Sequence, residues 1–111
     1  MGATKTIGNL EWQEETRRMT WDAAQQYAAS LGAGWRVPTR AELLTLLDDT
    51  RCDPACSAFP DTPSAFFWSS TPYAYNQDLA WVIDFAVGNV YGNYKGHESR
   101  VRCVRDVKEK E

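Results

Sequence analysis

The spacing of hydrophobic residues predicts two helices in the first half of the chain. Over 21–32 these residues recur at intervals of three and four, as on a helix with one buried side. Thr20 precedes this stretch as an expected N-cap, and Gly32 follows it as an expected stop. A second helix is expected after Thr39, because the segment TRAE has the form of a capping box and a leucine-rich stretch follows it.

Strand-like segments lie before and after these helices. An irregular alternation over 10–19 predicts a first strand, and a proline-rich loop without periodicity occupies 50–65. Four further segments have strand character, and Gly88-Asn89 is expected to form a tight turn between the second and the third. The order predicts an α+β domain with an antiparallel sheet after the helices. The four segments are FFWSST at 66–71, LAWVIDFAV at 79–87, NVYGNY at 89–94 and RVRCVRDV at 100–107.

Length and composition indicate one globular domain. The chain has 111 residues, of which 43% are hydrophobic and 24% charged, enough for one core. Five tryptophans spread along the chain predict an aromatic-rich core. The net charge of −3 provides no general attraction to nucleic acid or anionic membranes, so neither is an expected partner. Three arginines in RVRCVR at 100–105 have strand spacing, and we expect them to point to solvent.

The chain shows no targeting or membrane signal. Its start, MGATKTIGN, lacks an apolar segment, and no run of about 18 apolar residues occurs anywhere. We therefore expect neither a signal peptide nor membrane insertion, which leaves a cytoplasmic protein, a virion component or a piece of a longer chain. A single domain over 1–111 is expected, with its core at about 10–106 and a solvated tail at 107–111.

The three cysteines allow two interpretations. Cys52 and Cys56 have the spacing of a small disulfide loop, or all three are reduced and Cys103 packs in the core. Zinc would need a fourth ligand, and His97 is the single imidazole available. Four aspartates near the irregular loop offer oxygen ligands for calcium, but such acids usually serve solubility. No metal or other cofactor is therefore expected. The four aspartates are Asp48, Asp49, Asp53 and Asp61.

Six motifs occur in a distinctive order along the chain. They are MTWDAA at 19–24, WRVPTRAEL at 35–43, WSST at 68–71, AWVIDF at 80–85, Gly88 and VRCVR at 101–105. In this order they resemble the collagen-like adhesin C-terminal domain family, a branch of the C-type lectin fold related to the formylglycine-generating-enzyme type. The resemblance implies two helices flanking a small twisted antiparallel sheet. It implies little about function, because this fold hosts many unrelated sites.

Most residues in these motifs have structural interpretations. Trp35, Trp68 and Trp81 are expected in the core, because each lies in an apolar or strand-like context. Arg36 and Glu42 are expected to form a pair that holds the connector to the second helix. The chain lacks the E-P-N, Q-P-D and W-N-D tripeptides by which calcium-dependent lectins resemble one another. Calcium-dependent sugar binding is therefore not implied.

Polar and aromatic residues concentrate at 73–97. This segment holds four of the five tyrosines and the only histidine. Tyrosine offers a large rigid contact surface and asparagine adaptable hydrogen bonding, a mixture typical of antibody paratopes. The alternative is that some of these tyrosines are ordinary cross-strand residues. For the whole cluster we expect one exposed face that binds a protein or glycan ligand. Its residues are Tyr73, Tyr75, Asn76, Asp78, Asn89, Tyr91, Asn93, Tyr94 and His97.

The resemblance also suggests that this face is variable. Some proteins of the C-type lectin fold are targets of diversity-generating retroelements, which rewrite AAC codons as NNC codons. Nine positions here carry residues that NNC codons encode, whereas Gln77, Lys95 and Glu98 do not and would be unvaried. The expected function is a non-enzymatic recognition module with a variable binding face. The nine positions are Tyr73, Ala74, Tyr75, Asn76, Asp78, Asn89, Tyr91, Asn93 and Tyr94.

Two other functions stay open at this point. A glycan-binding adhesin domain would use Lys95, Arg100 and Arg102 for sulfated sugars, and its binding would fall steeply with salt. A small enzyme would need a reactive Cys103 or Cys56, and no G-x-S-x-G motif supports serine chemistry. We therefore expect no enzymatic activity, and the pattern predicts no particular oligomeric state.

Overall fold

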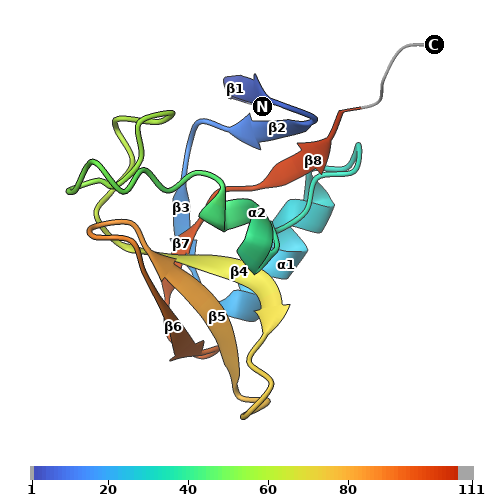
Figure 1. Cartoon of the computed structure of the whole chain (residues 1–111). Helices are drawn as coiled ribbons and strands as arrows, with labels where there is room; N and C mark the ends of the chain where they lie inside the picture. Colours follow the sequence, from blue (N-terminus) through green and yellow to red (C-terminus); the bar gives the residue numbers. More distant parts are fainter. Residues whose placement is uncertain (1, 108–111) are drawn as a thin grey trace.

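The computed structural model describes residues 2–107, and its regular structure is mostly β (Figure 1). Eight strands form two sheets, and two short helices lie beside them. The strands are β1 Thr4–Ile7, β2 Leu10–Gln13, β3 Arg17–Met19, β4 Phe66–Pro72, β5 Leu79–Asp84, β6 Asn89–Tyr94, β7 Ser99–Val101 and β8 Val104–Asp106. The helices are α1 Trp21–Ser30 and α2 Arg40–Leu44.

The two sheets differ in size and lie at opposite ends of the view in Figure 1. The smaller sheet has the order β1-β2-β8 and is antiparallel, so the last strand pairs with the first hairpin. The larger sheet has the order β3-β7-β4-β5-β6. All its neighbouring strands are antiparallel except β4 and β7, which are parallel. β6 is therefore an edge strand of the larger sheet.

Both predicted helix starts are confirmed. The side chain of Thr20 accepts a hydrogen bond from the Ala23 backbone N–H at 3.4 Å, and Gly32 follows α1 with a φ of +67°. Thr39 and Glu42 form the capping box, with hydrogen bonds of 3.2 Å and 2.8 Å. These signals are local in sequence, which is why the pattern alone locates them.

The predicted architecture of two helices flanking a small sheet is wrong. The helices have 10 and 5 residues, and each covers only part of a sheet, whereas eight strands carry the architecture. The second helix ends at Leu44 because the chain continues in tighter turns, with Leu46 and Leu47 each bonding a carbonyl three residues back. Residues 4–7, which no pattern identified, form an additional edge strand.

The segment expected as one strand at 100–107 is divided between the two sheets. Ser99–Val101 belongs to the larger sheet and Val104–Asp106 to the smaller one. The backbone N–H of Cys103 bonds the side chain of Gln13 at 3.0 Å instead of a strand neighbour. The chain therefore passes from one sheet to the other at residues 102–103. The predicted strand at 79–87 also ends early, because Phe85–Gly88 form the turn before β6.

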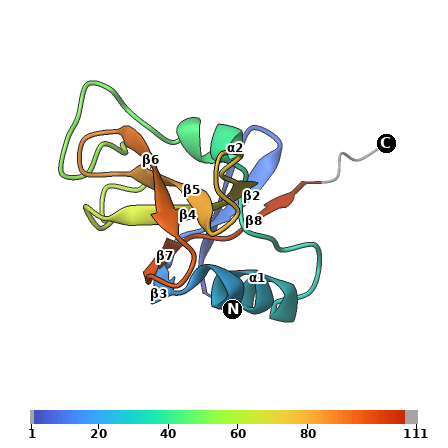
Figure 2. The ribbon, with the colours of Figure 1, turned by 90° about the horizontal axis from the view of Figure 1, so that it is seen from below.

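Buried residues form two clusters, one on each face of the larger sheet. On one face Ala24 and Ala28 of α1 pack in a cluster with Trp68 and Val82. On the other face Leu43 of α2 packs in a cluster with residues of β4 and β5 and reaches Trp12 of the smaller sheet. Figure 2 shows α1 and α2 on opposite sides of these strands.

Trp35 and Trp68 are buried, which confirms that prediction for these two tryptophans. Trp81 is half-buried, so the prediction that it lies in the core is wrong. All three cysteines are free thiols; Cys52 is exposed, whereas Cys56 and Cys103 are buried.

The described residues contain neither a metal-binding cluster nor a membrane-spanning helix. Within residues 2–107, no group of three or more histidine, cysteine or acidic side chains lies close enough together to hold a metal ion. Over the same residues, no helix has the length and apolar character needed to cross a membrane. The predicted tail at 107–111 lies outside the described residues, apart from Val107, which is exposed.

Candidate functional site

The hairpin of β5 and β6 sorts the predicted site residues onto two faces. Its register runs from the pair Leu79–Tyr94 to the pair Asp84–Asn89. Paired residues share a face and successive residues alternate, so Leu79, Trp81, Gly92 and Tyr94 lie on one face. Asn89, Tyr91 and Asn93 lie on the other. β6 is an edge strand, and Tyr94 on one face and Asn89 and Tyr91 on the other are exposed.

Aromatic rings pack against one another at tilted and edge-on angles on the face that contains Trp81. The Tyr73 and Trp81 ring centroids are 4.6 Å apart, and those of Tyr73 and Tyr75 are 5.7 Å apart in an edge-on arrangement. The Arg40 guanidinium carbon lies 4.3 Å from the Trp81 ring centroid. We call this surface the Trp81 face and define it as Arg40, Tyr73, Tyr75, Trp81 and Tyr94.

Gly92 lies beneath the Tyr73 ring and makes this stacking possible. A β-carbon at position 92 would lie 2.7 Å from Cδ1 of Tyr73 and 3.1 Å from Cδ2 of Leu79. Real β-carbons essentially never approach other atoms to 2.7 Å, so any larger residue would displace the ring. Gly92 is not among the predicted site residues. A glycine inside a strand is itself a signal for close approach of another group.

Hydrogen bonds from β4 hold Arg40 and Trp81 in place. The backbone N–H of Arg40 donates to Oγ1 of Thr71 at 3.0 Å, where β4 bulges away from β5. The hydroxyl of Ser69 donates to the Trp81 carbonyl at 2.7 Å. Ser69 and Thr71 of the WSST motif thus satisfy backbone groups of neighbouring segments. The motif also fixes the two residues at the centre of the Trp81 face.

The loop 73–78 is ordered by its own hydrogen bonds. Oδ1 of Asn76 accepts from the Asp78 N–H at 2.9 Å, and the Asp78 carbonyl accepts from the Lys95 N–H at 2.9 Å. Tyr75 lies at the tip, and 87% of its surface is exposed. The loop therefore presents Tyr75 to solvent from a defined backbone.

Asn89 and Tyr91 occupy the opposite face and the far end of β6. Nδ2 of Asn89 donates to the Tyr91 hydroxyl at 3.0 Å, and the Tyr91 ring packs on Phe66 at 5.6 Å. Five steps of about 3.3 Å place Asn89 about 16 Å from Tyr94 along the strand. These two residues do not join the Trp81 face.

Asn93 and His97 contact each other at the turn that follows β6. Asn93 donates from Nδ2 to the Ser99 hydroxyl at 3.1 Å, and its Oδ1 lies 3.2 Å from Nδ1 of His97. The His97 ring packs edge-on against Tyr94, with centroids 5.7 Å apart. Both ends of the Asn93 amide are thus occupied within the protein. Through His97, this cluster packs against the Tyr94 ring.

The Arg36–Glu42 pair is confirmed and holds the start of α2. Nη1 and Nη2 of Arg36 donate to the two Glu42 carboxylate oxygens at 2.6 Å and 2.8 Å. Nη2 also lies 3.1 Å from Asp106. The hydrogen bonds from Arg36 lower the pKa of Glu42 below its ordinary value, and the same bonds raise the pKa of Arg36. The pair fixes the turn that precedes Arg40.

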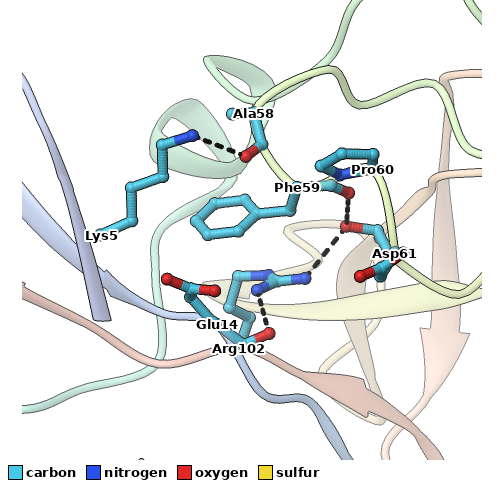
Figure 3. A pocket seen from close by; sticks show the side chains of 8 residues that line it. Lys5, Glu14, Ala58, Phe59, Pro60, Asp61 and Arg102 are labelled. Atoms are coloured by element: carbon cyan, nitrogen blue, oxygen red, sulfur yellow. Dashed lines mark hydrogen bonds between the residues drawn. The ribbon is translucent and has the colours of Figure 1, made fainter. Parts of the chain in front are cut away.

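A hollow of about 480 Å³ lies at the other end of the molecule, beside the smaller sheet (Figure 3). The guanidinium carbon of Arg102 lies 4.0 Å from the Phe59 ring centroid, and Nζ of Lys5 lies 5.6 Å from the same centroid. Glu14 and Asp61 also line the hollow. Its lining therefore has two cations and two carboxylates, with no net charge.

Arg102 is buried, so the prediction that it points to solvent is wrong. Only 3% of its surface is exposed. It donates to the carbonyls of Gln13 and Glu14 at 2.7 Å each and to the Thr62 hydroxyl at 3.0 Å. Burial lowers its pKa to about 10, so it stays charged at neutral pH. Since strand β7 ends at Val101, the alternation that would turn Arg102 outward ends one residue too early.

Comparison with protein families adds one finding. No curated protein matches the chain in a sequence comparison. A family model for the Lcl C-terminal domain matches residues 4–105. The matched segment begins at the first residue of β1 and ends within β8, so it includes both sheets and the whole Trp81 face. Because the match spans nearly all of the chain, the protein belongs to the Lcl C-terminal domain family.

Proposed function

We propose that this protein is a non-enzymatic recognition module that binds a protein or glycan ligand on the Trp81 face. The observation that carries the proposal is the exposure of two tyrosines beside the stacked rings, 87% for Tyr75 and 54% for Tyr94. Grouped exposed aromatic side chains are typical of binding sites. Membership of the Lcl C-terminal domain family is compatible with a recognition role.

The packing around this face favours binding with little loss of side-chain freedom. Tyr73 is held between Gly92 and the Trp81 ring, and Tyr94 is held by His97. Side chains that are already ordered lose less entropy when a ligand docks. Tyrosine hydroxyls supply hydrogen bonds at the rim of an otherwise aromatic surface.

Exposure also supports the proposal that a retroelement diversifies two segments, which include the loop 73–78 and both faces of β6. Seven of the nine positions with NNC-encoded residues are exposed, and only Tyr73 and Asn93 are partly buried. Ile83 and Phe85, in the segment between them, are fully buried. Substitution at exposed positions usually changes stability little, so a fold can tolerate variation there. A genomic test looks for a reverse-transcriptase gene and a near-copy of the coding segment that differs at AAC codons. Absence of both would refute diversification.

The direct test compares single variants on the two faces of the hairpin. Tyr75→Ala and Tyr94→Ala remove exposed rings from the Trp81 face, whereas Tyr91→Ala removes a comparably exposed ring, 43%, from the other. Labelled protein is applied to an array of purified glycans and to immobilised candidate surface proteins. We expect the first two variants to lose binding and Tyr91→Ala to keep it. Equal loss in all three, or loss that follows a drop in melting temperature, would refute the assignment.

Two features weaken the alternative functions. Arg102, which a sulfated-sugar site would use, is itself buried and directs its hydrogen bonds to oxygens of the protein. Burial raises the pKa of the Cys103 thiol to about 12, and a protonated thiol is a poor nucleophile. The proposal therefore includes neither a basic glycan site at Arg102 nor cysteine-based catalysis.

A further inference from the structure

We infer that Arg40 binds a carboxylate group of the ligand that docks on the Trp81 face. This inference rests on the proposed function of that face and adds the chemical class that it selects. Three observations support it: the Arg40 guanidinium has no hydrogen-bond acceptor within residues 2–107, it packs against the Trp81 ring, and no carboxylate lines the hollow beside it.

Arg40 differs from the other arginines of the chain. Six of the eight arginines donate to, or pair with, an oxygen of the protein within residues 2–107. The six are Arg17, Arg18, Arg36, Arg100, Arg102 and Arg105. Across that part of the chain neither Arg51 nor the guanidinium of Arg40 has such a partner, and Arg51 lies on an exposed loop. Arg40 alone is both held in position and free to bind.

The Trp81 ring, not an acceptor, holds the Arg40 guanidinium. Its carbon lies 4.3 Å from the ring centroid, and its Nε is buried without a hydrogen-bond partner. Within residues 2–107, no protein acceptor therefore competes with a ligand for this guanidinium. A guanidinium that packs against an aromatic ring can still donate hydrogen bonds from its Nη groups to a ligand.

The hollow beside Arg40 has no acid to compete for the cation. Its volume is about 410 Å³, and Arg40 is its only charged lining residue. The other lining residues are Thr39, Ala41, Leu44 and Thr71. Two other hollows of the described residues both contain carboxylates, at Glu14 and Asp61 in one and at Glu11 and Asp106 in the other. An anionic group is therefore favoured at Arg40 and not at either of those sites.

The shape of the guanidinium favours a carboxylate attached to a ring or apolar group. A planar guanidinium donates two parallel hydrogen bonds to the two oxygens of a carboxylate. The Trp81 ring contacts Arg40, and Tyr73 also packs against Trp81, so a ligand held at Arg40 lies next to aromatic surface. A carboxylate with an adjoining aromatic or apolar part would contact both.

The test uses two small probes that differ only in charge. N-acetylphenylalanine carries a carboxylate, and its primary amide is the neutral control. Each is titrated into the full chain while the Trp81 indole resonance is followed by NMR, whose assignment comes from a Trp81→Phe variant. We expect saturable shifts with the acid and binding about tenfold weaker with the amide, because hydrogen bonds to charged groups add about this much.

Two variants locate the effect. Arg40→Gln should lower the affinity for the acid to that for the amide, whereas Arg51→Gln should leave the difference between the two affinities unchanged. Equal binding of the acid and the amide by the unaltered protein would overturn the role of Arg40 without any variant, even if Arg40→Gln failed to fold. The proposed function would then still stand if Tyr75→Ala weakened both probes. If neither probe shifted the Trp81 indole resonance, the carboxylate inference would be overturned. The proposed function would be decided separately, by the binding of Tyr75→Ala and Tyr94→Ala to glycans and surface proteins.

Discussion

The Tyr73 ring lies so close to the Gly92 backbone that a β-carbon at position 92 would approach it to 2.7 Å. The loop between β4 and β5 thus depends on the absence of a side chain in β6. This contact joins the two segments of the candidate site, because Tyr73 also stacks on Trp81. The geometry of the Trp81 face is therefore sensitive to a residue that contributes no side chain to it.

Gly92→Ala is expected to displace Tyr73 and weaken ligand binding on the Trp81 face. Overpacking of this kind costs about 1–3 kcal/mol of stability. Gly96→Ala is the matched control, because a β-carbon there meets nothing within 4 Å. Thermal melts measure the loss of stability, and the NMR shift of the Trp81 indole resonance reports the displacement of Tyr73. An unshifted Trp81 resonance in Gly92→Ala would contradict the proposed contact.

Arg102→Met is expected to destabilise the protein although Arg102 lies near a surface hollow. The variant keeps an apolar stem but leaves the Gln13 and Glu14 carbonyls and the Thr62 hydroxyl without their donor. The loss should be about 2–4 kcal/mol in denaturant unfolding. Arg51→Met, on an exposed loop, should change stability by less than about 0.5 kcal/mol. Similar stability of the two variants would show that Arg102 is dispensable.

Stability should fall in acid as the Arg36–Glu42 pair is lost. The folded protein holds the pKa of Glu42 below its ordinary value of 4.5, so the unfolded chain binds this proton more readily. The contribution of the pair is therefore complete above about pH 4.5 and is lost as pH falls through the lower folded pKa.

Glu42→Gln isolates this effect, because glutamine also completes a capping box. We expect a loss of about 1 kcal/mol at neutral pH and a smaller loss on acidification. The exposed Arg18–Glu98 pair, at 3.7 Å, supplies the control variant Glu98→Gln, which should have little effect. Unfolding curves at neutral and acid pH give the comparison, and equal acid sensitivity of the original protein and Glu42→Gln would rule the pair out.

Only one thiol should react with a thiol reagent in the folded protein. Cys52 is exposed, whereas Cys56 and Cys103 expose 1% and 0% of their surface. The raised pKa of Cys103, about 12, slows its reaction further. Unfolding in guanidinium should make the thiols of Cys56 and Cys103 reactive as well. More than one fast thiol in the native state would mean that the loop around Cys56 opens readily.

Local signals in the sequence identified local structure correctly. The Thr20 cap, the Thr39–Glu42 capping box and the Arg36–Glu42 pair each involve residues at most six positions apart. Their side chains satisfy nearby backbone or charged groups whatever the remainder of the chain does. Predictions of this kind depend little on the fold.

Pairing between distant strands was not readable from the pattern. β2 pairs with β8 across more than ninety residues, and β4 lies parallel to β7. Hydrophobic alternation does not state which strand is the neighbour, so the second sheet and the division of residues 100–107 were missed. The same limit explains Arg102, two of whose three acceptors lie about ninety positions earlier in sequence.

The candidate site was partly predictable for a related reason. Composition pointed to Tyr73, Tyr75 and Tyr94, because four of the five tyrosines lie within residues 73–97. Strand register then decides which residues share a face, and it separates Tyr91 from them. Arg40 and Trp81 join the site only through contacts between segments about forty positions apart.

The pairing of β1, β2 and β8 in one sheet brings the two ends of the described chain to the same side of the molecule. The loop 73–78 lies at the opposite end (Figure 1). A tether, a label or a neighbouring domain attached at either end would therefore leave Tyr75 and its neighbours pointing away from the attachment. The protein can be immobilised through either terminus in a binding assay with the Trp81 face directed toward solution.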